Sequence, residues 1–104
     1  MIYNVRTYTV QPRLMKKYVG MFEAMALPAA GRLGMNLIAY FISQNGALNQ
    51  VVHIWAYESL AAYEIIRAAR DEDTEWENFL ESTTGLLVSQ EDKFMRPSSF
   101  SPLQ

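Results

Sequence analysis

The chain has 104 residues, of which 50% are hydrophobic and 12% aromatic, with a formal net charge of -2 and no cysteine. This length suits one domain over residues 1–104, and the interspersed charges give no basic surface, so nucleic acid is not an expected partner. The absence of cysteine excludes disulfides and thiolate chemistry. The start lacks a secretory signal, and the longest apolar run, LIAYFI, is far shorter than the roughly 20 residues of a membrane span. A cytoplasmic protein is predicted.

The first ten residues, MIYNVRTYTV, predict a strand in which Asn4 and Arg6 lie on the side opposite Val5 and Thr7. After Pro12, apolar residues recur at helical spacing, which predicts an amphipathic helix that Pro28 limits or kinks near Leu27. The apolar positions of that helix are Leu14, Tyr18, Met21, Phe22 and Met25.

A second strand is predicted at LIAYFIS, and the pair Asn45-Gly46 predicts a tight turn into a third strand, LNQVVHIWAYES. Alternation divides this third strand into two sets of side chains that face opposite sides. One set is Asn49, Val51, His53, Trp55 and Tyr57, and the other is Gln50, Val52, Ile54 and Ala56. Neither set is plainly polar, so both faces of the strand are expected to be covered.

Ser59 is placed to cap a helix over LAAYEIIRAAR, and a further helix follows in DEDTEWENFLESTT, capped either by Asp73 or by the pair Thr74 and Glu77. One face of that helix carries Trp76, Phe79, Leu80 and Thr83. Gly85 ends it, LLVSQEDKFM predicts the last strand, and residues 97–104 are expected to form an extended C-terminal arm.

The order of these elements predicts an α+β, ferredoxin-like βαββαβ fold with a split second helix and an antiparallel four-stranded sheet. In that plan the helices cover one face of the sheet and leave about 350 Å² of the other bare. We expect Tyr8, Tyr40, Trp55 and Tyr57 on the bare face. A face so apolar needs a cover, and a second copy in a homodimer is the simplest one.

Several segments together resemble the bacterial NIPSNAP domain: MIYNVRTYTVQP, LNQVVHIWAYESL, EW followed by FL at Trp76 to Leu80, and LLVSQEDKFMRPSSFSP. They occur in the family's order and separation over nearly the whole chain. The resemblance implies a dimeric α/β barrel, in which two ferredoxin-like protomers meet sheet to sheet, in a bacterial protein. It implies architecture more than activity, because the family has no well-established reaction.

His53, the only histidine, is the one candidate general base, because its ordinary pKa lies near neutrality. The alternative is a packed, hydrogen-bonded core histidine. A guanidinium at Arg6 that faces inward needs a partner, which is either a ligand carboxylate or Glu91 or Asp92. One histidine with scattered carboxylates predicts no metal site, and no phosphate-cradling loop is present, so no cofactor is expected.

Two functions remain open from the sequence. The first is a homodimeric protein that binds a small apolar or aromatic molecule in a cavity between the two sheets. The ligand-binding residues predicted for it are Arg6, Tyr8, Tyr40, Asn49, His53, Trp55 and Tyr57. The alternative is an enzyme, a cofactor-independent monooxygenase or haem-degrading oxygenase, with His53 as base and Asn49 or Arg6 as oxyanion partner; it rests on fold analogy. A structural dimer with no cavity is a third reading.

Overall fold

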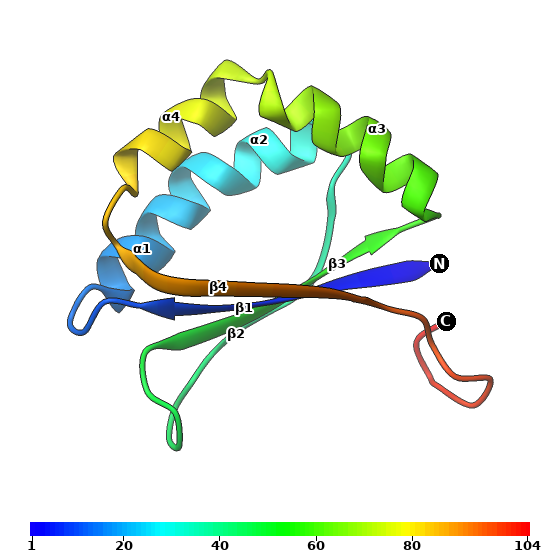
Figure 1. The fold of residues 1–104 in the computed structure, drawn as a ribbon, viewed down its shortest axis with the longest axis horizontal. Helices are drawn as coiled ribbons and strands as arrows, with labels where there is room; N and C mark the ends of the chain where they lie inside the picture. Colours follow the sequence, from blue (N-terminus) through cyan, green and yellow to red (C-terminus); the bar gives the residue numbers. More distant parts are fainter.

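A computed structural model describes residues 1–104 as a four-stranded sheet with a layer of helices on one face (Figure 1). The chain order confirms the predicted α+β, ferredoxin-like plan with a split second helix. The elements are β1 (Ile2–Val10), α1 (Met15–Met21), η1 (Phe22–Ala26), α2 (Leu27–Arg32), β2 (Asn36–Ile42), β3 (Gln50–Tyr57), α3 (Leu60–Asp71), α4 (Thr74–Ser82) and β4 (Leu87–Met95).

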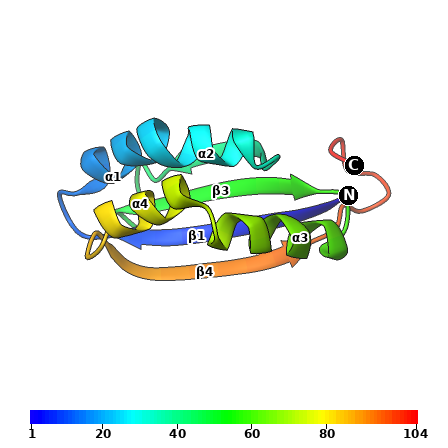
Figure 2. The same ribbon diagram turned by 90° about the horizontal axis from the view of Figure 1, so that it is seen from above.

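The sheet is antiparallel with the strand order β2-β3-β1-β4, so β2 and β4 form its edges. Residues that pair across strands share a face. Arg6 of β1 lies opposite His53 of β3 and Asp92 of β4, which brings three polar side chains from three strands into one row. Seen from above, the helices lie over the sheet with β4 at the margin of the helix layer (Figure 2).

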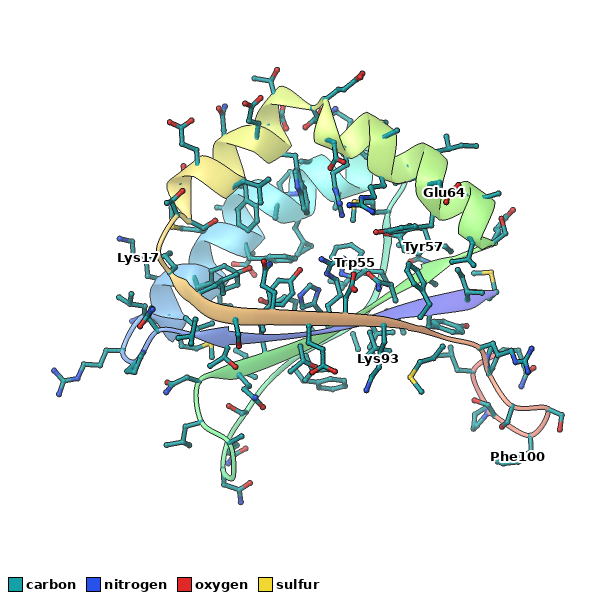
Figure 3. All side chains as sticks on the ribbon, in the orientation of Figure 1. Lys17, Trp55, Tyr57, Glu64, Lys93 and Phe100 are labelled. Atoms are coloured by element: carbon teal, nitrogen blue, oxygen red, sulfur yellow. The ribbon has the colours of Figure 1, made fainter.

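The two faces of the sheet carry different side chains, and the helices cover the face with the large ones. Trp55 and Tyr57 point from β3 toward the helices, whereas Lys93 of β4 points away from them (Figure 3). The predicted placement of Tyr8, Tyr40, Trp55 and Tyr57 on the bare face is therefore wrong. Alternation along a strand separates two sets of side chains but does not say which set the helices cover.

The uncovered face carries smaller apolar residues, which are the other members of the alternating pattern. Val5, Val52 and Ile54 are half-buried there, and Phe41 is 58% exposed. The covered face contributes Val10 and Val51, which are completely buried, to a core of 15 residues shared with the helices. The sequence therefore supports a core on one face, while the other face carries apolar residues of β1, β2 and β3 beside Glu91 and Lys93 of β4.

Of the two predicted effects of Pro28, a limit or a kink near Leu27, the first does not occur, because the helix does not end there. The chain remains helical from Met15 to Arg32, but its hydrogen bonding changes to a π-helical pattern at η1 just before the proline. A proline lacks the N–H that an α-helix needs in its interior, and a π-helical turn is a local way to absorb that disruption. The helix ends at Arg32, and Gly34 just beyond it has a φ of 81°, which favours glycine.

The two later helices begin as the sequence predicts. The side chain of Ser59 accepts a hydrogen bond of 3.0 Å from the backbone N–H of Ala62 at the start of α3. At α4 the cap is Asp73, one of the two predicted alternatives, whose carboxylate accepts from the backbone N–H of Trp76 at 2.9 Å. Capping side chains of this kind satisfy free amides that a helix start leaves unpaired.

Two connections differ from the expectation. The β2–β3 hairpin has a loop of residues 43–49 in place of a two-residue turn, and both Gly46 and Asn49 have positive φ. The C-terminal arm does not stay extended, because the side chain of Gln104 donates to the backbone carbonyls of Ser98 and Ser101. The hydroxyl of Tyr3 donates to the Gln104 carbonyl at 2.6 Å, which ties the arm to the sheet.

Candidate functional site

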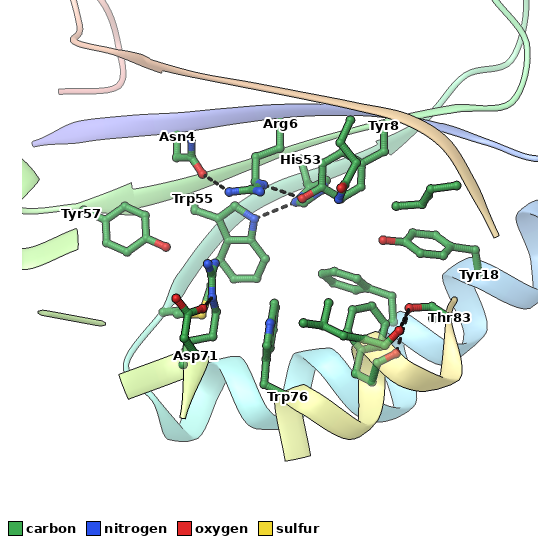
Figure 4. A pocket seen from close by; sticks show the side chains of 17 residues that line it. Asn4, Arg6, Tyr8, Tyr18, His53, Trp55, Tyr57, Asp71, Trp76 and Thr83 are labelled. Atoms are coloured by element: carbon green, nitrogen blue, oxygen red, sulfur yellow. Dashed lines mark hydrogen bonds and ion pairs between the residues drawn. The ribbon is translucent and has the colours of Figure 1, made fainter. Parts of the chain in front are cut away.

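A cavity of about 140 Å³ lies between the covered face of the sheet and the helices (Figure 4). Most of its walls are aromatic or aliphatic, and its polar groups come mainly from β1 and from the end of α3. It is lined by Asn4, Arg6, Tyr8, Tyr18, Phe22, Met35, His53, Trp55, Tyr57, Arg70, Asp71, Trp76, Phe79, Leu80, Thr83, Leu87 and Gln90.

The cavity opens toward β4. Leu80, Asp71 and Gln90 line it and are exposed, whereas the residues that line its floor on β1 and β3 are largely buried. β4 is an edge strand at the margin of the helix layer, and all of its residues except the first are exposed (Figure 2). A small molecule therefore has a route into the cavity between β4 and the α3–α4 segment.

Arg6 is the main charged group on the floor of the cavity. Its Nε donates to the hydroxyl of Tyr8 at 2.6 Å, and its Nη1 donates to Oδ1 of Asn4 at 3.0 Å. Nη1 also lies 3.2 Å from a carboxylate oxygen of Asp92. Burial lowers the pKa of Arg6, but Tyr8 and Asp92 more than offset this, so the pKa lies above its usual value. Of the two predicted carboxylate partners, Asp92 is the correct one; Glu91 faces the opposite side of the sheet.

His53 is held by its neighbours as a neutral ring. The indole Nε1 of Trp55 donates to its Nδ1 at 2.7 Å, and Tyr40 stacks on it with ring centres 5.0 Å apart. Because Nδ1 accepts, the proton of the neutral imidazole is on Nε2, which is buried and has no partner. Burial, and then the charge of Arg6, lower the pKa of His53 from 6.5 to about 3.

This arrangement does not suit His53 for the role of general base that its ordinary pKa indicates. Trp55 occupies the only lone pair of the neutral ring, and a pKa of about 3 makes His53 a weak proton acceptor near pH 7. The alternative considered from the sequence, a packed and hydrogen-bonded histidine, matches the geometry better. The loss of basicity follows from the helix layer, which excludes water from the ring.

The predicted ligand-binding residues divide into two groups. Five of them line the cavity: Arg6, Tyr8, His53, Trp55 and Tyr57. Tyr40 and Asn49 do not. Tyr40 packs behind the ring of His53, with its hydroxyl buried and without a partner. Asn49 lies in the hairpin loop with φ of 64°, where its backbone carbonyl accepts from Val10 at 2.7 Å. The cavity also lies beneath the helices and not between two sheets, because the large side chains face the helices.

The helices supply the residues that strand alternation could not find. The face of α4 predicted from helical spacing lines the cavity in full, with Trp76, Phe79, Leu80 and Thr83. Arg70 had no sequence signal, since its neighbour Arg67 on the same helix has the same chemistry. The side chain of Arg70 is 13% exposed and that of Arg67 is 58% exposed. The guanidinium of Arg70 lies 5.3 Å from the ring centre of Trp76, a cation–π contact.

No three His, Asp or Glu side chains gather in an arrangement that would hold a metal ion. None of the helices has both the length and the apolar character needed to cross a bilayer.

The NIPSNAP family model matches residues 3–102 of the chain. Protein NipSnap homolog 2 of Homo sapiens is 35% identical over 103 residues, which are 99% of this chain and 35% of that protein. The chain thus spans about a third of the length of the curated relatives it matches.

Comparison with solved structures gives the same family. A NIPSNAP family protein from Agrobacterium tumefaciens superposes with a TM-score of 0.93 at 34% identity, covering 99% of this chain and 98% of that one. An antibiotic biosynthesis monooxygenase superposes with a TM-score of 0.66 at 10% identity, covering 94% of this chain and 99% of that one. This second likeness shows a shared ferredoxin-like fold alone. Since the family model spans almost every residue, and a relative of 35% identity covers 99% of the chain, the chain belongs to the NIPSNAP family.

Proposed function

We propose that this chain binds a small aromatic molecule in the cavity between its sheet and its helices. The observation that carries the proposal is a cavity of about 140 Å³ with aromatic walls and a few inward-facing polar groups. This combination of an apolar concave surface with a small number of orienting polar groups is typical of small-molecule sites. The predicted residues that line the floor of this cavity remain our proposed binding residues. The helix residues form the opposite wall.

The volume limits the size of the molecule. An apolar cavity of about 150 Å³ holds benzene, so 140 Å³ is enough for one six-membered ring. The tetrapyrrole of haem is several times larger than one ring and would require the helices to separate from the sheet. Haem degradation is therefore the least compatible of the activities considered.

The aromatic rings in the cavity walls are arranged so that an aromatic ligand can pack among them. Phe79 meets the ring of Phe22 nearly at right angles, with centres 5.7 Å apart, and lies 5.6 Å from the ring of Trp76. These rings present both edges and faces to the space between them. Because aromatic pairs favour edge-to-face and offset arrangements, a further ring can add to this cluster with favourable electrostatics as well as burial of apolar area.

We also propose that two copies associate through the uncovered faces of their sheets. Half-buried valines and isoleucine, together with the exposed Phe41, form an apolar area on this face, with Glu91 and Lys93 of β4 at its edge. The face itself supplies about 350 Å² per copy, or about 700 Å² in total, whereas a stable dimer buries at least roughly 1,200 Å². Phe100 of the C-terminal arm is 88% exposed and Leu48 of the hairpin loop is 63% exposed, so both can extend the contact.

A second candidate function is a cofactor-independent monooxygenase, favoured by the fold shared with the antibiotic biosynthesis monooxygenase. Here Arg6 and the Tyr8 hydroxyl would hold the anion of a phenolic substrate, since His53 is unsuited as a base. Oxygen consumption with a panel of quinols tests it. Turnover that is lost in Arg6→Lys supports an enzyme, whereas binding without oxygen uptake supports the binding function.

The binding proposal is tested by titrating phenol into the protein and following the aromatic signals of Trp55 and Trp76 by NMR. We expect saturable shifts in the wild type. The variant Leu80→Trp, at the mouth of the cavity, should weaken binding by about tenfold by filling the mouth. Leu60→Trp is the matched control, because Leu60 is 55% exposed and Leu80 is 53% exposed, but Leu60 does not line the cavity.

Unchanged phenol binding in Leu80→Trp, or equal loss in Leu60→Trp, would place the ligand elsewhere. If neither phenol nor any other single-ring aromatic shifts the wild-type signals up to about 10 mM, the protein has no aromatic site of useful affinity and the proposal fails.

A further inference from the structure

The charges around the cavity are unevenly exposed to water. The side chains of Arg6 and Arg70 line it and are only 18% and 13% exposed. Their acidic partners Asp92 and Asp71 are 42% and 56% exposed. Water screens an exposed charge far more strongly than a buried one. Each arginine therefore has one acidic partner. The positive charges of the arginines affect the cavity more strongly, because water largely screens the negative charges of the aspartates.

Several free polar groups inside the cavity are donors. Arg6 uses Nε and Nη1 for its contacts with protein atoms, and its Nη2 makes none. The Tyr8 oxygen accepts from Arg6, which leaves its own proton available. The hydroxyl of Tyr18 has no protein partner and points into the cavity (Figure 4). Burial, and then Tyr40 and Tyr8, raise the pKa of Tyr18, so that it stays a protonated donor.

His53 adds no competing acceptor to the cavity. Its one lone pair is taken by Trp55, and the free ring nitrogen, Nε2, carries a proton. The cavity floor thus offers a guanidinium edge beside hydroxyl donors and an aromatic wall. An oxyanion attached to a flat ring satisfies both features, because a carboxylate can accept from the free Nη2 of Arg6 and from the hydroxyl donors, and the ring matches the aromatic walls.

We propose that the cavity selects single-ring aromatic monocarboxylates, with the carboxylate on Arg6 and the ring between Trp55 and the α4 residues Trp76 and Phe79. This inference rests on the proposed binding function and names the chemical class of its ligand. The cavity measures about 140 Å³, enough for one ring.

The test compares three probes by calorimetric titration at pH 7: benzoate, its neutral analogue benzamide, and acetate, which has the carboxylate without the ring. We expect benzoate to bind at least about tenfold more tightly than either of the others. If benzamide binds as tightly as benzoate, the charge selection is wrong while the binding function stands. If acetate binds as tightly, the ring selection is wrong. If neither ring compound binds, the proposed function itself fails.

A variant pair locates the carboxylate. Arg6→Gln removes the charge and the free Nη2 donor, and it should abolish the preference of benzoate over benzamide. Arg67→Gln is the matched control, because it removes an equal charge from the exposed side of α3 and should keep the full preference. A retained preference in folded Arg6→Gln overturns the assignment to Arg6. If Arg6→Gln does not fold, the three-probe comparison in the wild type still decides the ligand class.

Discussion

The two faces of the sheet are built from alternate residues of the same four strands, and they differ in chemistry. The covered face has large side chains with polar atoms, such as Arg6, His53 and Trp55, whereas the uncovered face has small apolar ones such as Val52 and Ile54. Helices surround a bulky side chain from several sides and can enclose a cavity. The proposed binding and the proposed association therefore lie on opposite faces of one sheet.

The largest expected effect on stability comes from removing a large side chain from the covered face. Trp55→Ala should lower the free energy of unfolding by about 3–5 kcal/mol, because it leaves a cavity and deprives His53 of its hydrogen bond. Ile54→Ala, on the next residue and the opposite face, should cost about 1–2 kcal/mol, since Ile54 is only half-buried within one copy. Urea denaturation of dilute protein measures both. Equal losses would mean that the two faces are equally packed.

The second prediction concerns the dependence of stability on pH. The unfolded chain binds a proton at His53 below about pH 6.5, whereas the folded chain binds one only near pH 3. The contribution of neutral His53 to the free energy of unfolding is thus fully present above pH 6.5 and is lost as the pH falls toward 3. Between pH 6.5 and 4.5 the free energy of unfolding should fall by about 2–3 kcal/mol.

His53→Gln checks the source of that loss, because glutamine can accept from Trp55 but does not titrate. Its stability should change much less over the same range. The capping carboxylate Asp73 does not interfere, since its pKa is lowered by the N–H of Trp76 and by Arg32 and it titrates at lower pH. An equal pH dependence in both proteins would show that His53 is not kept neutral by the fold.

The smallest expected effect concerns self-association through the uncovered face. Phe41→Asp places a charge on the uncovered face and should weaken self-association by at least about tenfold, or 1.4 kcal/mol, without lowering the stability of dilute protein by a similar amount. Sedimentation across a concentration series measures it. Glu64→Lys on α3, which faces away from the sheet, is the control (Figure 3). A wild-type protein that stays monomeric at high concentration would contradict the dimer.

The candidate site was partly accessible from the sequence. Strand alternation correctly grouped Arg6 with Tyr8 and His53 with Trp55, and helical spacing correctly grouped Trp76 with the rest of its face. Tyr40 shares the face of His53 but packs behind its ring, and Asn49 lies in a loop, so neither lines the cavity. No local pattern distinguished Arg70 from Arg67, since burial of a side chain depends on elements far away in the sequence.

Local chemistry by itself determined the order of strands and helices, the helix caps at Ser59 and Asp73, and the membership of each strand face, because these depend on residues a few positions apart. Only the tertiary structure decided which face the helices cover, where the cavity lies, and that His53 is a buried hydrogen-bond acceptor with a lowered pKa. Those properties depend on desolvation by distant segments, and that requires the packed layers.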